Sequence, residues 1–316
     1  GKLVWGDPHD PLIFIDAKPN ACGMLVGGLD EIPRPTNIIK NINRILSSEI
    51  YIDNIKLKWD FKKGNHFIDV FETDHRAMEL GDFPQYMFII HGSVPELQAE
   101  TEKGVGLYYD KSKTLNDMAK KINTPFGPLL YLDGTDANAY LEFFEYAKVF
   151  AAQKRIKAAE QLFGQFEIIS NPMHQGLISF AELLLGAQHI SEDSAHIFPV
   201  ALRGDLPAFL IKSKPNLTPE QIEILGFEKR AHKLEIFERL TDFNAVPHGG
   251  GYAFSHISKV MEVREIDHER FFICEQENEN GISIMNDPSA IEFSYRGKKI
   301  INKIIDLDLG KVVAKL

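Results

Sequence analysis

The chain has 316 residues, of which 44% are hydrophobic and 25% charged, and its formal net charge is −10. This composition is typical of a globular protein with a sizeable core, and it excludes a low-complexity or fibrous chain. An acidic chain lacks the basic face needed for broad non-specific nucleic-acid binding, although a local basic groove or bound metal ions could still meet an RNA or nucleotide.

Three features of the sequence indicate a cytoplasmic protein without a membrane partner. No stretch approaches the roughly 20 apolar residues of a membrane span. The first residues, GKLVWGDPHD, lack the basic-then-apolar pattern of a secretion signal. Cys22 and Cys274 lie too far apart in the chain to suggest a disulfide framework, so a reducing compartment is expected.

Short apolar runs rich in β-formers recur along the whole chain and predict strands. These strands are expected at Leu12–Asp16, His66–Phe71, Met87–Ile90, Leu129–Leu132, Phe166–Ile169, Ile197–Leu202, Ala208–Lys212 and Phe271–Glu275.

Helical patterns alternate irregularly with these strands. An apolar stripe that follows Thr36 predicts a helix capped by this threonine. A longer helix is expected from about Ala139 to Phe163, where Gly164 ends it. Thr218 and Gln221 frame a helix start in which a capping threonine, a first-turn proline and a glutamine all agree.

The irregular order of elements favours a mixed α+β fold over a doubly wound sheet or a regular barrel. No internal repeat and no linker rich in Pro, Gly or Ser is present, so residues 1–316 are predicted to form a single domain. Residues 277–316 open with the polar run ENENG and are expected to form a peripheral C-terminal hairpin or strand.

Five residues occupy positions that suit a chemical site. His66 begins a predicted strand in GNHFIDVFE, His91 ends one in MFIIHGS, and His174 follows the run FEIISN. His248 lies in VPHGGGY, where glycines allow the backbone to approach a ligand closely, and Cys22 lies in PNACGM. Because strand ends hold side chains rigidly and leave them open to a cleft, these residues are candidates for a metal site or a nucleophile.

Each of these residues alone also fits a structural role, since a lone cysteine usually behaves as a small hydrophobe. Together, imidazole and thiolate suit Zn, Cu, Fe, Co or Mn rather than Mg or Ca. A histidine beside a glycine-rich loop could instead be a nucleophile for a phosphoryl or nucleotidyl group. The remaining histidines are weaker candidates: His75, His189, His232 and His268 lie among charged residues, and His196 and His256 stay undecided.

In chain order, these segments resemble the RtcB-type RNA ligases, which join RNA ends using GTP and manganese. The resemblance covers about Cys22 to His256, and its most specific piece is GNHFID, which is similar to the family's G-N-H-F-x-E motif. Weaker matches are Pro19–Met24 to D-x-x-C-G-M, His91–Ser93 to a histidine followed by Gly and Ser, His174 to H-N-x-x-K, Gly204–Ser213 to G-x-P-x-x-I-x-x-S, and His248–Tyr252 to H-G-A-G-R.

The resemblance implies an RtcB-like fold in which helices pack around a central metal-binding cleft. It implies that Cys22 bridges two metal ions, Mn or else Zn or Co, that His91 and His174 complete one site, and that His66 serves the other. His248 would carry GMP as a phosphoramidate. The residues implied to bind GTP are Asn65, Phe67, Asp69, Ser213, Gly249 and Gly250.

Departures from the family pattern keep other readings open. The family's metal-binding aspartate falls at Pro19, so a second metal would be lost or would be held by Asp16 or Asn20. The arginine after the glycine-rich loop is Tyr252 here, and no arginine follows His91 directly. The alternatives are a metal-binding module with weak or no ligase activity, or a metal-dependent phosphoesterase in which His248 acts as an acid or base.

Overall fold

Short strands and a few helices alternate along the chain in the computed structural model. It describes residues 1–61, 66–74, 83–125, 127–190, 197–201, 206–214, 216–241, 243–249, 252–254, 257–266, 269–276, 282–286, 293–295 and 299–316. The elements in chain order are β1 (Lys2–Val4), β2 (Leu12–Phe14), β3 (Cys22–Leu29), α1 (Pro35–Ser47), β4 (Tyr51–Ile52), β5 (Ile55–Lys56), β6 (Phe67–Glu72), β7 (Tyr86–Gly92), the 3₁₀ turn η2 (Pro95–Leu97), α2 (Lys113–Met118), β8 (Lys120–Thr124), β9 (Gly127–Asp133), α3 (Gly134–Phe163), β10 (Glu167–Ser170), β11 (Met173–Ser179), β12 (Glu182–Leu185), β13 (Ala187–His189), β14 (Ile197–Val200), β15 (Phe209–Ser213), α4 (Pro219–Ile224), α5 (Glu228–Lys233), α6 (Phe237–Thr241), β16 (Ala245–Pro247), β17 (Tyr252–Phe254), β18 (Ile257–Ile266), β19 (Glu269–Gln276), β20 (Ile282–Met285), β21 (Phe293–Tyr295), α7 (Lys299–Asp306) and β22 (Gly310–Lys315).

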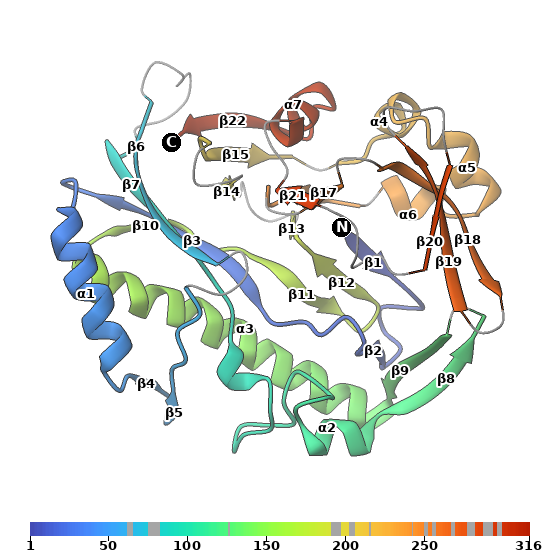
Figure 1. The fold of residues 1–316 in the computed structure, drawn as a ribbon, viewed down its shortest axis with the longest axis horizontal. Coiled ribbons are helices and arrows are strands. Elements are labelled where there is room, and N and C mark those ends of the chain that lie inside the picture. Colours follow the sequence, from blue (N-terminus) through green and yellow to red (C-terminus); the bar gives the residue numbers. More distant parts are fainter. Residues whose placement is uncertain are drawn as a thin grey trace.

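A seven-stranded antiparallel sheet forms the centre of this mixed α+β fold (Figure 1). Its strands follow the order β1-β12-β11-β3-β7-β6, and β10 pairs with the far end of β3. Every residue of β3 is buried, as expected for a strand with neighbours on both edges. The prediction of an α+β fold is therefore confirmed.

The two faces of the β3–β7 pair are covered differently. Leu25 of β3 and Phe88 of β7 face helix α3, where they pack with Leu162. The alternate residues, Met24 and Met87 among them, pack against the small sheet β14-β15-β22. Figure 1 shows this small sheet above the pair and α3 below it. Since side chains alternate along a strand, Cys22 shares the face of Met24 and points away from α3.

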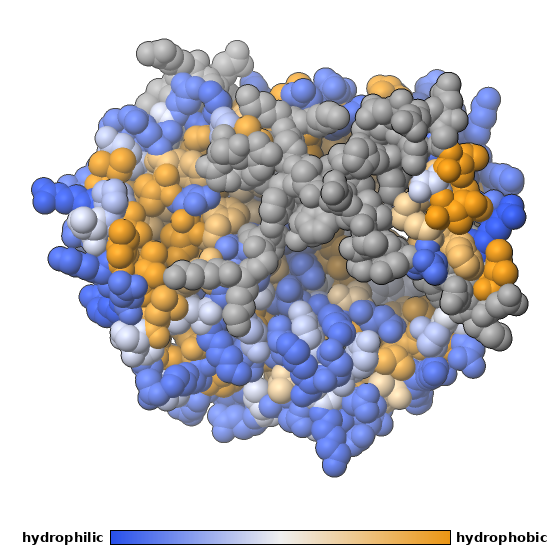
Figure 2. Space-filling model, in the orientation of Figure 1, coloured by the Kyte–Doolittle hydropathy of each residue, from blue (hydrophilic) through white to orange (hydrophobic). Residues whose placement is uncertain are grey.

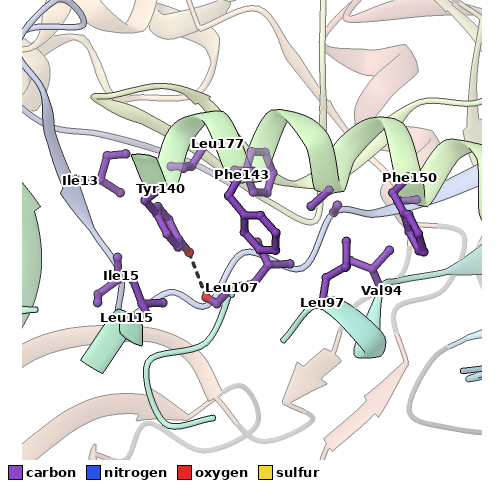
Figure 3. Close-up of a cluster of buried hydrophobic side chains, with 14 of the residues drawn as sticks. Ile13, Ile15, Val94, Leu97, Leu107, Leu115, Tyr140, Phe143, Phe150 and Leu177 are labelled. Carbon is purple, nitrogen blue, oxygen red and sulfur yellow. Dashed lines mark hydrogen bonds between the residues drawn. The ribbon is translucent and has the colours of Figure 1, made fainter. Parts of the chain in front are cut away.

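The first half of α3 is held by an apolar cluster (Figure 3). Tyr140, Phe143 and Phe150 project from one side of the helix toward Leu97 and Leu107. The hydroxyl of Tyr140 donates a hydrogen bond of 2.9 Å to the carbonyl oxygen of Leu107, so its buried polar atom is satisfied.

Most predicted strands and helices are present, with two corrections. Helix α1 begins at Pro35 and its N-cap is Arg34, not Thr36, because proline at the first helical position fixes the helical φ one residue earlier. The strand β3 was not predicted. On the Cys22 face, β3 and β7 are covered by the strands β15 and β22.

The C-terminal residues 299–316 pack into the apolar core, whereas a peripheral extension was expected for residues 277–316. Strand β22 pairs with β15, and Val313 and Ala314 are buried against Met24. Helix α7 contributes Ile304 to a neighbouring core cluster. Burial of apolar side chains on both elements explains why this polar-looking tail folds back into the domain.

The surface in Figure 2 is uneven in polarity. Apolar side chains gather at the left of this face, in the region of β6 and β7, whereas polar side chains cover its lower part near α2. Within the described part of the chain, no helix combines the length and the apolar character needed to cross a lipid bilayer.

Candidate metal centre

The register of the central sheet brings four predicted ligands to one end of it. Cys22 is the first residue of β3, and its strand neighbour β7 ends with His91 and Gly92, with Met24 opposite His91. On the other side of β3, strand β11 pairs Gln175 with Cys22 and carries His174. Because β6 starts opposite the end of β7, with Phe67 facing His91, the preceding His66 reaches the same end.

The donor atoms of these four side chains form a continuous series of contacts. Cys22 Sγ lies 2.9 Å from His91 Nε2 and 3.3 Å from His66 Nε2. His91 Nε2 in turn lies 3.0 Å from His174 Nε2. The donor atoms of Cys22, His66 and His91 all lie within 4.8 Å of one another. Three imidazole nitrogens and a thiol from four remote segments therefore converge on one small volume.

Asp60 orients His66. Its Oδ2 lies 2.8 Å from His66 Nδ1, and it also accepts hydrogen bonds from the backbone N–H and the hydroxyl of Ser93. With Nδ1 facing a carboxylate, the lone pair of the neutral ring lies on Nε2, on the side of Cys22. A carboxylate behind a histidine in this way is a recurrent feature of metal sites.

His248 lies beside the cluster, held by the turn between β12 and β13. Its Nδ1 lies 2.8 Å from the carbonyl oxygen of Gly186, which can only accept, so Nδ1 carries the proton and Nε2 carries the lone pair. The His248 ring packs 4.3 Å from the ring of His174, between centroids. A Cβ at Gly186 would come within 2.9 Å of the His248 ring, so glycine is required for this approach.

Burial dominates the electrostatics of the centre. It raises the pKa of the Cys22 thiol to about 12, although the neighbouring Arg155 guanidinium favours the thiolate. Burial, with the nearby His248 and His91, lowers the pKa of His174 well below its usual value of 6.5. Burial alone would raise the pKa of Asp60, but its contacts with His66 and Lys154 outweigh this effect and hold it at about 2.

The donor set fits a transition metal ion. Thiolate and imidazole ligands suit Zn, Co or Fe, and by the usual affinity order they bind Mn less tightly. His174 Nδ1 is buried and has no hydrogen-bond partner among the described residues, an arrangement that costs free energy unless the ring has another role. Cys22, His66 and His91 are the residues that would hold the ion, with His174 adjoining them.

The two positions considered from the sequence for a second metal ion each use a side-chain oxygen in a backbone hydrogen bond. Asp16 Oδ2 accepts a hydrogen bond of 2.6 Å from the backbone N–H of Leu130. Asn20 Oδ1 accepts one of 3.0 Å from the backbone N–H of Cys22. Among the described residues, the cluster of Cys22, His66 and His91 is the one group of three such ligands.

The residues implied to bind a nucleotide are distributed more widely. Phe67 adjoins the cluster, with its ring centroid 5.4 Å from that of His91, and Asp69 lies two residues further along β6, where burial raises its pKa. Gly249 follows His248 with a φ of +92°, in the left-handed region. Ser213 lies at the end of β15, in a hollow that Lys214 and Asp308 also line. Neither the four residues of the cluster nor His248 lines this hollow. Asn65 and Gly250 lie outside the described residues.

Three residues that contact the site were missed in the sequence. Asp60 gave no signal, because an isolated carboxylate in KLKWDF resembles any exposed acid. Lys154 and Arg155 could have been found. They lie three or four residues from the buried Ala151 and Ala158, which places these two cations on the buried side of the helix. Both cations are only 3% exposed.

Comparison of this chain with models of known protein families, with curated proteins and with solved structures found no match in any of the three.

Proposed function

We propose that the chain is a metal-dependent nucleotidyl transferase that joins RNA ends, in which Cys22, His66, His91 and His174 hold a transition metal ion. The observation that carries the proposal is the contact series from His66 through Cys22 and His91 to His174. These residues and His248 are also the ones singled out by their order in the resemblance to RtcB-type ligases. Metal, GTP and RNA are all part of the proposal.

The protein side chains have distinct roles in this proposal. A bound divalent ion, Mn²⁺ by the resemblance, supplies positive charge that neutralises phosphate oxygens. His248 Nε2 attacks the α-phosphorus of GTP, a P–N bond forms, the bond to the β-phosphate oxygen breaks, and pyrophosphate leaves. The Nδ1–H group stays hydrogen-bonded to the Gly186 carbonyl, which stabilises the positive charge that develops on the ring. The GMP is then passed to an RNA end.

The test is covalent labelling. Protein loaded with Mn²⁺ is incubated with GTP labelled at the α-phosphate, and in parallel with GTP labelled at the γ-phosphate. We expect an acid-labile adduct with the first label and none with the second, because the γ-phosphate leaves in pyrophosphate. His248→Ala is expected to abolish the adduct, and His232→Ala, at a histidine stacked on Phe237 in another part of the chain, is expected to retain it. Absence of an adduct in the metal-loaded wild-type protein, or equal labelling of His248→Ala, would contradict the proposal.

A second candidate function is metal-dependent hydrolysis of a phosphoester. It is favoured by the backbone hydrogen bonds of Asp16 and Asn20, each of which occupies a side-chain oxygen that a second ion would otherwise use. The loss of the family arginine at Tyr252 favours it as well, since such arginines hold phosphates. In this case His248 acts as an acid or base. Release of product from an RNA 2′,3′-cyclic phosphate without any covalent adduct would support hydrolysis, and binding of RNA ends without turnover would instead indicate a binding module.

A further inference from the structure

Two buried cations lie side by side on α3, directly behind the metal-ligand cluster. Lys154 and Arg155 are each 3% exposed, in the part of the helix that packs on β3 and β7. Burial of two adjacent charges costs several kcal/mol unless each is well paired and hydrogen-bonded. Their contacts therefore identify what they do.

Arg155 contacts the three segments that carry Cys22, His91 and His174. Its Nη1 donates to the carbonyl oxygens of Gly92, at 3.3 Å, and of Ala21, at 3.5 Å. Its Nε donates to Asn171 Oδ1 at 2.7 Å. Ala21 precedes Cys22, Gly92 follows His91, and Asn171 lies three residues before His174. One planar guanidinium thus fixes the spacing of three ligand-bearing segments.

Lys154 holds the fourth ligand indirectly. Its ammonium donates to the carbonyl oxygens of Lys58, at 2.6 Å, and Ser93, at 2.9 Å. It also lies 3.1 Å from Glu96 Oε2 and 3.7 Å from Asp60 Oδ1. Asp60 in turn contacts His66, so Lys154 anchors the loop on which the orientation of His66 depends.

Gly23 and Asn171 allow the Arg155 guanidinium to lie close to the ligand-bearing segments. A Cβ at Gly23 would come within 2.8 Å of Arg155 Nη2 and 2.5 Å of the Pro172 carbonyl oxygen. Asn171 is itself fixed, since its Nδ2 donates to the carbonyl oxygen of Ala152, on the same helix. The helix therefore contacts the ligand segments through both the guanidinium and the asparagine.

We propose that Arg155 and Lys154 are positioning residues, which set the geometry of the metal ligands before the ion binds. This inference rests on the metal centre of the proposed function. Ligands held in place by supporting hydrogen bonds lose less freedom on binding, and removal of such support typically lowers metal affinity roughly 10–100-fold.

The experiment is a Co²⁺ titration of the full chain followed by absorption spectroscopy. Co²⁺ reports both affinity and ligand geometry, through its d–d bands and its thiolate charge-transfer band. Arg155→Lys retains the charge but lacks the planar spread of Nε–H and Nη1–H groups that contacts Asn171 and the two carbonyl oxygens, so we expect roughly 10–100-fold weaker Co²⁺ binding and shifted bands. Lys157→Met is the matched control, because Lys157 is exposed on the same helix and pairs, among the described residues, with the nearby Glu160. It is expected to leave affinity and spectrum unchanged.

Asn171→Ala provides a second, milder variant should Arg155→Lys fail to fold, as judged by circular dichroism. It removes the acceptor of the Arg155 Nε–H group and is expected to shift the spectrum in the same direction. If the wild-type chain shows no thiolate–Co²⁺ band, the metal centre itself is wrong. If the wild type binds Co²⁺ but the folded variants keep its affinity and spectrum, even with lowered melting temperatures, the two cations are only structural and the inference fails.

Discussion

The two parts of helix α3 contact very different surroundings. Up to about Ala151 the helix packs apolar side chains into the cluster of Figure 3, where the Tyr140 hydroxyl is paired with the Leu107 carbonyl. At Lys154 and Arg155, the same buried side of the helix presents two cations to backbone oxygens at the ends of β3 and β7, before Ala158 and Leu162 return to apolar packing. One helix thus supports both an apolar core and a polar centre.

The apolar cluster and the cluster around Cys22 differ in whether their arrangement stabilises the fold. The apolar cluster is explained by burial alone, at roughly 25 cal/mol per Å² of apolar surface removed from water. Burial alone does not explain the cluster around Cys22. Its thiol and imidazole nitrogens face one another, and His174 Nδ1 has no hydrogen-bond partner among the described residues. Polar atoms collected in this way lower stability unless a ligand uses them.

The largest expected effect is the loss of metal binding in Cys22→Ser. The thiolate is the only sulfur donor of the cluster, and serine neither ionises near neutral pH nor suits Zn or Co. We expect metal affinity to fall by more than the roughly 10–100-fold typical of an outer-shell change. Elemental analysis of protein purified without chelator, and a Co²⁺ titration, measure it.

Cys274→Ser is the matched control, since Cys274 is also buried but lies on β19, paired with Val260 and Ser283 rather than with the cluster. It is expected to retain full metal content. Equal metal content in wild type and Cys22→Ser would mean that Cys22 is not a metal ligand, and that the cluster around it does not differ in this respect from the apolar core.

Several parts of the fold could be predicted from local patterns, but the central strand could not. Strand β3 has the sequence CGMLVGGL, and three glycines are typical of a loop. They are needed because a Cβ at Gly27 would overlap the Phe88 ring, and one at Gly23 would meet Arg155. Both neighbours come from remote segments, so no local pattern contains this constraint.

The residues of the candidate site were predictable for a different reason. Cys22, His66, His91 and His174 each lie at or beside a strand end, and their types and order could be recognised in the sequence. Their supporting residues were not predicted, because Asp60 acquires its role only through the packing of its loop against Lys154 and His66. A thiol or an imidazole can be recognised as a possible metal ligand from its residue type alone. The role of a supporting residue depends on its position in the folded chain, which the sequence does not give.

A smaller effect, confined to stability, is expected for Leu115→Ala in the apolar cluster. Leu115 lies on α2 and is fully buried in this cluster, and the change should lower the free energy of unfolding by about 2–5 kcal/mol through lost burial and a cavity. Metal affinity of the folded protein should stay within a factor of two. Urea unfolding measures the first and Co²⁺ titration the second. A large loss of affinity would mean that the two parts of the helix are coupled rather than separate.

The smallest effect is the pH dependence of the metal-free protein. Because His174 is buried and its pKa lies well below 6.5, the unfolded chain takes up a proton near pH 6.5 that the folded chain does not. The stabilising contribution is therefore complete above pH 6.5 and decreases as the pH falls below it, by at most about 1.4 kcal/mol per pH unit for one proton. Urea unfolding at pH 7.5, 6.5 and 5.5 should show this decline in the wild type and a shallower one in His174→Gln. Leu115→Ala should run parallel to the wild type, offset by a constant amount, because the apolar cluster exchanges no proton on unfolding. A wild-type stability that does not change between pH 7.5 and 5.5 would mean that His174 is not held neutral by its surroundings.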